Sequence, residues 1–125
     1  MTNYLCVLVG GGLGSLARYV VGRAILQAVP AIYFAWPTFV INVAGSFLIG
    51  LLMTLLVERL QLSHYWQLIF VVGFLGGFTT FSSFEYDAYL ATRSGHSLTA
   101  LLYLVSSVVA GYGAVWLGVS VVPKS

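Results

Sequence analysis

The chain has 125 residues, of which 60% are hydrophobic and 6% are charged, and its mean hydropathy is +1.00. Soluble domains carry about 25% charged residues, and a soluble fold of this length could not bury so much apolar side chain. The formal net charge of +2 arises from five Lys and Arg against three Asp and Glu, too few for a nucleic-acid-binding patch. The composition therefore predicts an all-α integral membrane protein with the lipid bilayer as its partner and no nucleic acid.

Charged residues and prolines divide the chain into four apolar stretches. Each is near or above the roughly 20 residues that cross a bilayer as a helix. The stretches are apolar around most of their circumference, as membrane helices are. We expect one four-helix transmembrane domain over residues 1–125, with helices at about 4–27, 38–57, 66–92 and 97–122.

The first span combines glycines with one charged residue. Gly10 and Gly14 have the spacing of small residues that lets membrane helices pack closely, and Gly73 and Gly77 repeat it in the third span. Arg18 lies within the first span, towards its end. Its side chain could extend to the lipid headgroups, or it could raise the local potential for an anion in a vestibule.

Polar residues in the second span form one row. Thr38, Asn42 and Ser46 recur every four residues and so share a helix face. The Asn42 carboxamide offers two N–H donors and carries no negative charge, which suits an anion path. The same side chain could instead join neighbouring helices by hydrogen bonds.

The segment from Gly73 to Phe84 has the composition of a broken membrane helix. Irregular backbone occurs at membrane depth only where protein buries it or where it lines a polar cavity. We expect the break at Gly76-Gly77-Phe78-Thr79-Thr80, where carbonyls and hydroxyls would face an ion. Phe81 and Phe84 follow on adjoining parts of one face. Their ring edges are weakly positive and could approach an anion, although such residues in membrane helices mostly face lipid or the core.

The fourth span carries Tyr103 and Ser107 four residues apart, with Ser106 beside them. We expect Ser106 to bond a carbonyl of its own helix. Across all four spans, the interior polar groups are amides, hydroxyls and aromatic edges. This inventory favours passage of an anion.

Acidic residues lie away from the middle of the spans or near one end of the third, at Glu58, Glu85 and Asp87. A proton-coupled carrier usually needs a buried carboxylate. His64 and His96 lie in expected loops, and no Ser/His/Asp or metal-ligand cluster is visible, so we do not expect an enzyme.

Positive charges are nearly balanced across the expected membrane. Arg59 and Lys124 fall on the side of the two termini, whereas Arg23 and Arg93 fall on the other, with Arg18 nearby. Orientation normally follows an asymmetry in Lys and Arg. The chain could therefore insert in both orientations and pair with an inverted copy, or it could simply carry few charges.

These features together resemble the Fluc (CrcB) fluoride channel family, and the resemblance covers essentially the whole chain. It rests on Gly10-Gly11-Gly12-Leu13-Gly14 with Arg18, on Asn42-Val43-Ala44-Gly45, and above all on Gly73 to Phe84. The resemblance implies a fluoride-selective channel that passively exports cytoplasmic fluoride and gives fluoride resistance. It also implies residence in the bacterial inner membrane.

The resemblance further implies an antiparallel, dual-topology homodimer with two pores at its interface. A structural sodium ion would lie at the dimer centre, held by the backbone carbonyls of Gly76 and Thr79. Asn42, Phe81 and Phe84 would line the pores. Ser83, Tyr103 and Ser107 would form a polar track, which the family often continues one turn further, where this chain has Gly111 instead of a hydroxyl.

Two other classes of membrane protein remain as alternatives. A small multidrug transporter has a similar length and four helices, but it would be expected to carry a glutamate in the first span, where this chain has none. A structural membrane subunit would explain the glycine faces, but it gives no reason for a helix break in mid-membrane.

Overall fold

A computed structural model of the chain describes residues 1–30 and 33–124. It contains four helical spans long and apolar enough to cross a membrane, so the predicted all-α membrane fold is confirmed. The first and fourth spans are the single helices α1 (Thr2–Ala28) and α6 (Ser97–Ser120). The second consists of α2 (Trp36–Leu52) and the π-helical turns η1 (Met53–Arg59). The third consists of α3 (His64–Gln67), π-helical η2 (Leu68–Leu75), α4 (Gly76–Phe78) and α5 (Ser82–Arg93).

The third span is broken, as predicted, and the interruption lies at the C-terminal end of the expected segment. Gly76 and Gly77 remain helical in α4. Thr79 then adopts an extended conformation, with φ −85° and ψ 158°, and the next helix begins at Ser82. The irregular backbone is therefore confined to the threonine pair and the phenylalanine that follows.

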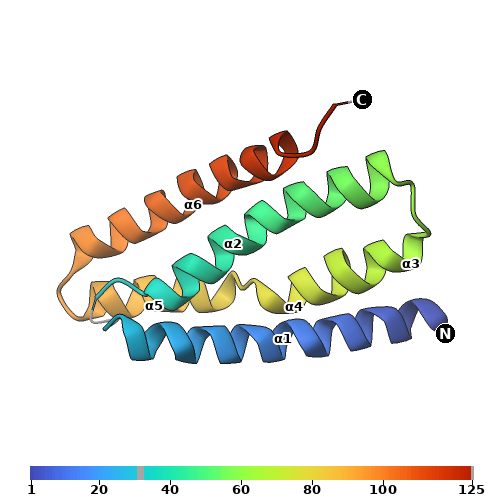
Figure 1. Cartoon of the computed structure of the whole chain (residues 1–125). Helices are drawn as coiled ribbons and strands as arrows, with labels where there is room; N and C mark the ends of the chain where they lie inside the picture. The colour runs from blue at the N-terminus through green and yellow to red at the C-terminus, as the bar shows by residue number, and fades with distance from the viewer. Residues whose placement is uncertain (31–32, 125) are drawn as a thin grey trace.

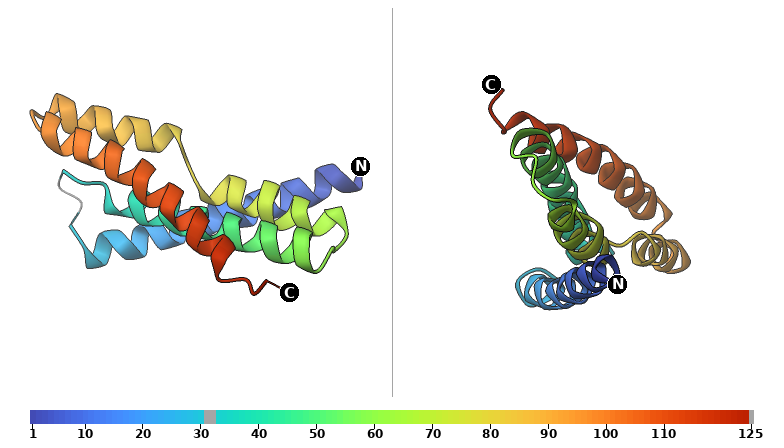
Figure 2. Two further views of the ribbon diagram at one scale, coloured as in Figure 1. Left: turned by 90° about the horizontal axis from the view of Figure 1, so that it is seen from above. Right: turned by 90° about the vertical axis from the view of Figure 1, so that its right-hand side faces the viewer.

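The break lets the two halves of the third span pack against different helices. η2 and α4 lie along α1, whereas α5 lies along α6. Seen from above, the chain crosses from one side of the bundle to the other at the break (Figure 2). α2 lies between α1 and α6 and contacts both. The two termini lie at the same end of the bundle (Figure 1), as four crossings require.

Glycines allow α1 to pack directly on the backbone of the third span. A Cβ atom on Gly10 would overlap the carbonyl oxygen of Ile69, and one on Gly14 would overlap that of Phe74. In return, a Cβ on Gly77 would overlap the carbonyl oxygen of Gly11. Such close backbone contact is how membrane helices gain packing energy without a hydrophobic driving force. The spacing of small residues in the sequence therefore reflects a real helix contact.

Replacing Gly14 by alanine should destabilise the protein because the added methyl group must displace backbone atoms of Phe74. Overpacking of this kind costs about 1–3 kcal/mol. Gly12→Ala is the matched control, since a Cβ on Gly12 meets no atom within 4 Å. Thermal unfolding of the purified proteins in detergent should show a lower midpoint for Gly14→Ala alone. Equal midpoints for the two variants would contradict this packing.

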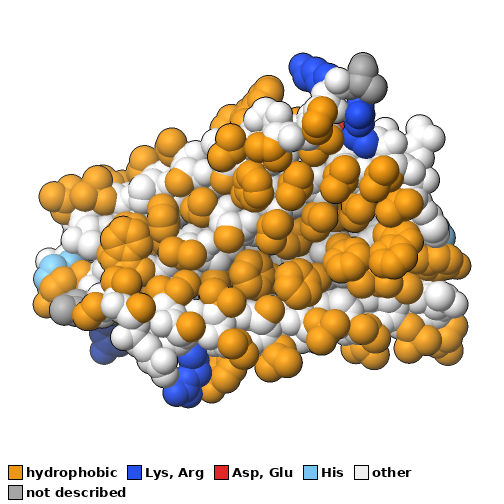
Figure 3. All heavy atoms as spheres, viewed as in Figure 1, with side chains coloured by type: hydrophobic (Ala, Val, Ile, Leu, Met, Phe, Trp, Pro, Cys, Tyr) orange, Lys and Arg blue, Asp and Glu red, His pale blue; other side chains and the backbone are white. Residues whose placement is uncertain are grey.

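The outer surface of the bundle is strongly apolar. Large hydrophobic side chains cover the visible face between two ends that carry the Lys and Arg side chains (Figure 3). The core is small by comparison, and its aromatic centre consists of Phe84 and Tyr103 with Phe34 and Phe39 packed against them. In water this surface would be an aggregation liability, but in a bilayer it faces lipid or other apolar surface.

Candidate functional site

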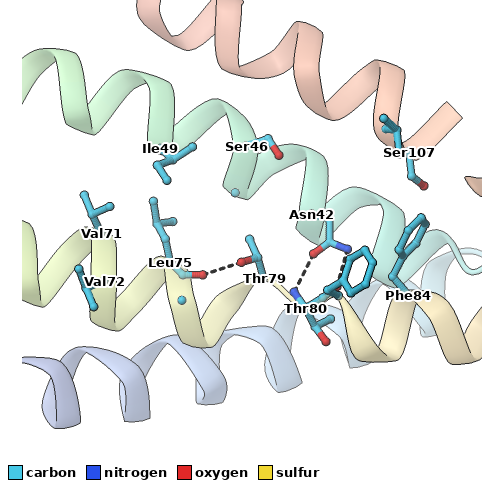
Figure 4. Close-up of a pocket in the computed structure, with 14 residues that line it drawn as sticks. Asn42, Ser46, Ile49, Val71, Val72, Leu75, Thr79, Thr80, Phe84 and Ser107 are labelled. Atoms are coloured by element: carbon cyan, nitrogen blue, oxygen red, sulfur yellow. Dashed lines mark hydrogen bonds between the residues drawn. The ribbon is translucent and has the colours of Figure 1, made fainter. Parts of the chain in front are cut away.

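An open groove of about 580 Å³ runs along the third span beside the helix break (Figure 4). Its walls come from α2, η2, α4, the break, α5 and α6, so most of the fold contributes to it. No residue that lines it has an ionisable side chain. The lining residues are Asn42, Gly45, Ser46, Ile49, Val71, Val72, Leu75, Gly76, Thr79, Thr80, Phe81, Phe84, Ser107 and Val108.

Asn42 binds the backbone of the break at both ends of its carboxamide. Its Nδ2 donates to the carbonyl oxygen of Thr80 at 2.9 Å, and its Oδ1 accepts from the Thr80 N–H at 2.9 Å. The side chain thereby supplies the partners that a continuous helix would otherwise provide. Because Nδ2 carries two hydrogens, one N–H remains available to the groove.

The two threonines satisfy other polar groups at the break. The Thr79 Oγ1 and N–H both donate to the carbonyl oxygen of Leu75, at 2.8 and 3.0 Å. The Thr80 Oγ1 accepts from the Ser83 N–H at 3.3 Å, at the start of α5. Within residues 1–30 and 33–124, the carbonyl oxygens of Gly76 and Thr79 accept no hydrogen bond. These two carbonyls are therefore free to bind a ligand.

Arg18 connects α1 to the same region. Its Nε donates to the carbonyl oxygen of Gly77 at 3.1 Å, and the side chain is partly buried. Gly77 lies in the last turn before the break. A positive charge at the C-terminal end of a helical segment stabilises the partial negative charge of its carbonyls. The guanidinium therefore contacts the last helical turn before the break, a role in addition to the two considered from the sequence.

The two phenylalanines that line the groove, Phe81 and Phe84, differ in how exposed they are. Phe84 is 6% exposed and packs against Tyr103, with ring centroids 5.1 Å apart. Phe81 is 74% exposed and lies 5.9 Å from Phe84 between ring centroids. Tyr103 itself is 1% exposed, and its hydroxyl donates to Asp87 Oδ2 at 3.1 Å. Tyr103 thus contacts the groove through Phe84 and is not among the lining residues.

The predicted serines lie in different surroundings. The Ser107 Oγ is buried, lines the groove and has no hydrogen-bond partner among the described residues. Ser106 bonds the Tyr103 carbonyl oxygen at 3.4 Å, as expected for a serine that bonds its own helix. Ser83 contributes its N–H to the break but does not line the groove.

The structure therefore brings six predicted residues into one groove and leaves three beside it. Asn42, Gly76, Thr79, Phe81, Phe84 and Ser107 line the groove, whereas Arg18, Ser83 and Tyr103 do not. Thr80 and Ser46 also line the groove, although neither was named as a pore residue from the sequence. The sequence placed Thr80 within the break, whose hydroxyls would face an ion, and Ser46 in the helical row with Thr38 and Asn42.

These features define a four-span membrane protein with an uncharged, mostly apolar groove that carries a few amide and hydroxyl groups beside a broken helix. Residues 5–119 match the family described as CrcB-like protein, Camphor Resistance (CrcB). The chain therefore belongs to the CrcB family, and the predicted resemblance is confirmed.

Several similar proteins support this assignment. A protein of Solibacter usitatus is 56% identical, with 93% of this chain and 94% of the relative covered. A protein of Acidobacterium capsulatum is 48% identical, with 95% and 94% covered, and one of Chloroflexus aurantiacus is 46% identical, with the same coverage. Each of these three relatives is named a fluoride-specific ion channel, FluC.

Proposed function

We propose that this chain forms a fluoride-specific ion channel in the bacterial inner membrane, where it lets cytoplasmic fluoride leave the cell. Support comes from the FluC relatives and from the groove. The observation that carries the proposal is that Asn42 and a few hydroxyls provide polar groups in an otherwise apolar groove whose lining contains no carboxylate. Such groups can replace part of an anion's hydration shell and do not repel it.

Passive conduction is sufficient for removal of fluoride. Hydrogen fluoride enters a cell as a neutral molecule, and fluoride is trapped when the proton leaves. A negative cell interior then drives a monovalent anion outward with about 2.3 kcal/mol per 100 mV. Selectivity over chloride would come from the size of the path and the number of its donors. The chain then works as a channel and not as an enzyme.

We further propose that the functional unit is an antiparallel homodimer. Phe81 lines the groove but is 74% exposed on a single chain, so one subunit leaves the path open on this side. A second copy would close it. The near balance of positive charge at the two ends of the spans favours insertion in both orientations.

Two or three lysines added near Lys124 should force one orientation and abolish fluoride resistance, because an antiparallel pair could no longer form. Coexpression with a variant biased the opposite way, by lysines near Arg93, should restore resistance. Growth of fluoride-sensitive bacteria on fluoride measures both effects. Full resistance from one strongly biased variant alone would contradict dual topology.

The free carbonyls of Gly76 and Thr79 suit a structural sodium ion at the dimer centre. Hard cations bind oxygen ligands such as backbone carbonyls. Among the described residues, no group of three or more His, Cys, Asp or Glu side chains could hold a metal. A sodium-sized density peak between the two breaks, coordinated by these oxygens, would be the expected crystallographic result. A direct protein contact filling that position would contradict it.

The channel proposal is tested by release of fluoride from liposomes that contain only this protein. Chloride is the comparison anion, because the proposal requires selectivity as well as conduction.

A further inference from the structure

The polar surface of the groove extends one helical turn beyond Asn42 and Ser107. α2 and α6 pack against each other and run in the same direction (Figure 1). Ser46 follows Asn42 by four residues on α2, and Gly111 follows Ser107 by four on α6, so each pair stacks along one helix face. Ser46 and Gly111 meet, since a Cβ on Gly111 would lie 3.3 Å from Ser46 Oγ.

The hydroxyl of Ser46 is free to serve the groove. Serines inside helices commonly bond a carbonyl of the preceding turn, as Ser106 and Ser120 do here. Ser46 makes no such bond within the described part of the chain, and it faces the groove from α2 (Figure 4). Ser107 also has a hydroxyl without a hydrogen-bond partner among the described residues, and its Oγ is buried.

Gly111 provides the space that an ion needs beside Ser46. A side chain at this position would crowd Ser46, because its Cβ alone would lie 3.3 Å from the hydroxyl oxygen and 4.0 Å from the Ser46 Cβ. With glycine, α6 approaches α2 closely and still leaves the hydroxyl uncovered. Ser46 therefore forms a second polar level of the groove, one turn beyond Asn42. Gly111 does not line the groove itself, but it lies behind this level and leaves room beside the Ser46 hydroxyl.

We propose that Ser46 is a direct donor to the permeating anion at this second level, and that Gly111 keeps the level open. The inference rests on the proposed channel function. It adds Ser46 to the residues that would bind a small monovalent anion such as fluoride. In this arrangement the anion passes from the donors of Asn42 and Ser107 to the hydroxyl of Ser46.

The test is fluoride efflux from liposomes that contain wild-type protein, Ser46→Ala, Gly111→Ser or the double variant. Hydrogen bonds to charged groups are among the stronger ones in proteins, and removing this donor should lower fluoride flux by about tenfold. Gly111→Ser should also lower flux, because its side chain crowds the Ser46 hydroxyl. The double variant moves the hydroxyl from α2 to α6 and removes the crowding, so it should recover most of the flux.

Ser106→Ala is the matched control, because it removes a hydroxyl that bonds its own helix outside the groove. Its flux should equal that of the wild type. Size-exclusion chromatography establishes that each variant keeps the wild-type assembly. Wild-type flux in a well-assembled Ser46→Ala protein would overturn the inference and leave the channel proposal intact. Absence of fluoride flux in the wild type would instead overturn the channel proposal itself.

Discussion

Replacing Asn42 by aspartate should abolish fluoride conduction while the protein still assembles. The carboxylate keeps the acceptor for the Thr80 N–H but loses the donor to the Thr80 carbonyl. It also places a negative charge in a groove that has no ionisable lining residue. Two like charges about 4 Å apart repel by about 4 kcal/mol at the effective dielectric constant of a protein. We therefore expect fluoride efflux to fall by about 100-fold or more.

Two further variants distinguish the effect of a negative charge in the groove from the effect of lost hydrogen bonds at the break. Asn42→Leu leaves the Thr80 N–H and carbonyl unpaired, and each unpaired buried group costs about 1–3 kcal/mol, so its thermal midpoint should fall as well as its flux. Asn3→Asp makes the same chemical change as Asn42→Asp at the exposed start of α1, where Asn3 contacts His64. It should conduct normally. An assembled Asn42→Asp protein with wild-type flux would place the carboxamide outside the anion path.

Changing Phe81 or Phe84 to isoleucine should lower fluoride flux, because each change removes a weakly positive ring edge from the groove. Pairs of aromatic rings gain about 0.5–1.5 kcal/mol from the same ring quadrupole, and an anion contact of that size would correspond to a flux loss of up to about tenfold. The stability of the two variants should differ. Phe84→Ile removes a packed contact with Tyr103 and should lower the thermal midpoint, whereas exposed Phe81 makes a smaller contribution to the subunit core.

Phe70→Ile is the control for this pair, since Phe70 stacks on Trp66 and does not line the groove. Efflux and thermal unfolding should be measured on the same purified samples. Wild-type flux in stable Phe81→Ile and Phe84→Ile proteins would assign both rings to packing. The anion path would then be assigned to the polar groups of the groove, Asn42 and Ser107 among them.

The spans and the break could be predicted because they depend on local sequence. A run of about 20 apolar residues fixes a membrane helix whatever its neighbours are. A Gly-Gly pair followed by two threonines marks the interruption, although the local signal places it too early: Gly76 and Gly77 stay helical, and the chain leaves the helix at Thr79. The π-helical turns of η1 and η2 left no signal in the apolar pattern.

The partners of the polar groups could not be predicted in the same way. Asn42 and Thr80 are 38 residues apart, and Arg18 and Gly77 are 59 apart. Their contacts depend on how the helices pack, which apolar periodicity does not specify when a helix is apolar all round. Tyr103 shows the same limit, because its spacing to Ser107 gives no sign of its bond to Asp87. The sequence therefore allowed most polar residues of the groove to be identified, but it did not allow their hydrogen-bond partners to be predicted.

Fluoride efflux from liposomes that contain only the purified protein tests the central claim most directly. With a potassium ionophore to balance charge, an ion-selective electrode follows the release of fluoride and, in parallel samples, of chloride. We expect rapid loss of fluoride through the wild-type protein, retention of chloride, and little fluoride release through Asn42→Asp. Retention of fluoride by well-assembled wild-type protein, or equal release of the two anions, would contradict a fluoride-specific channel.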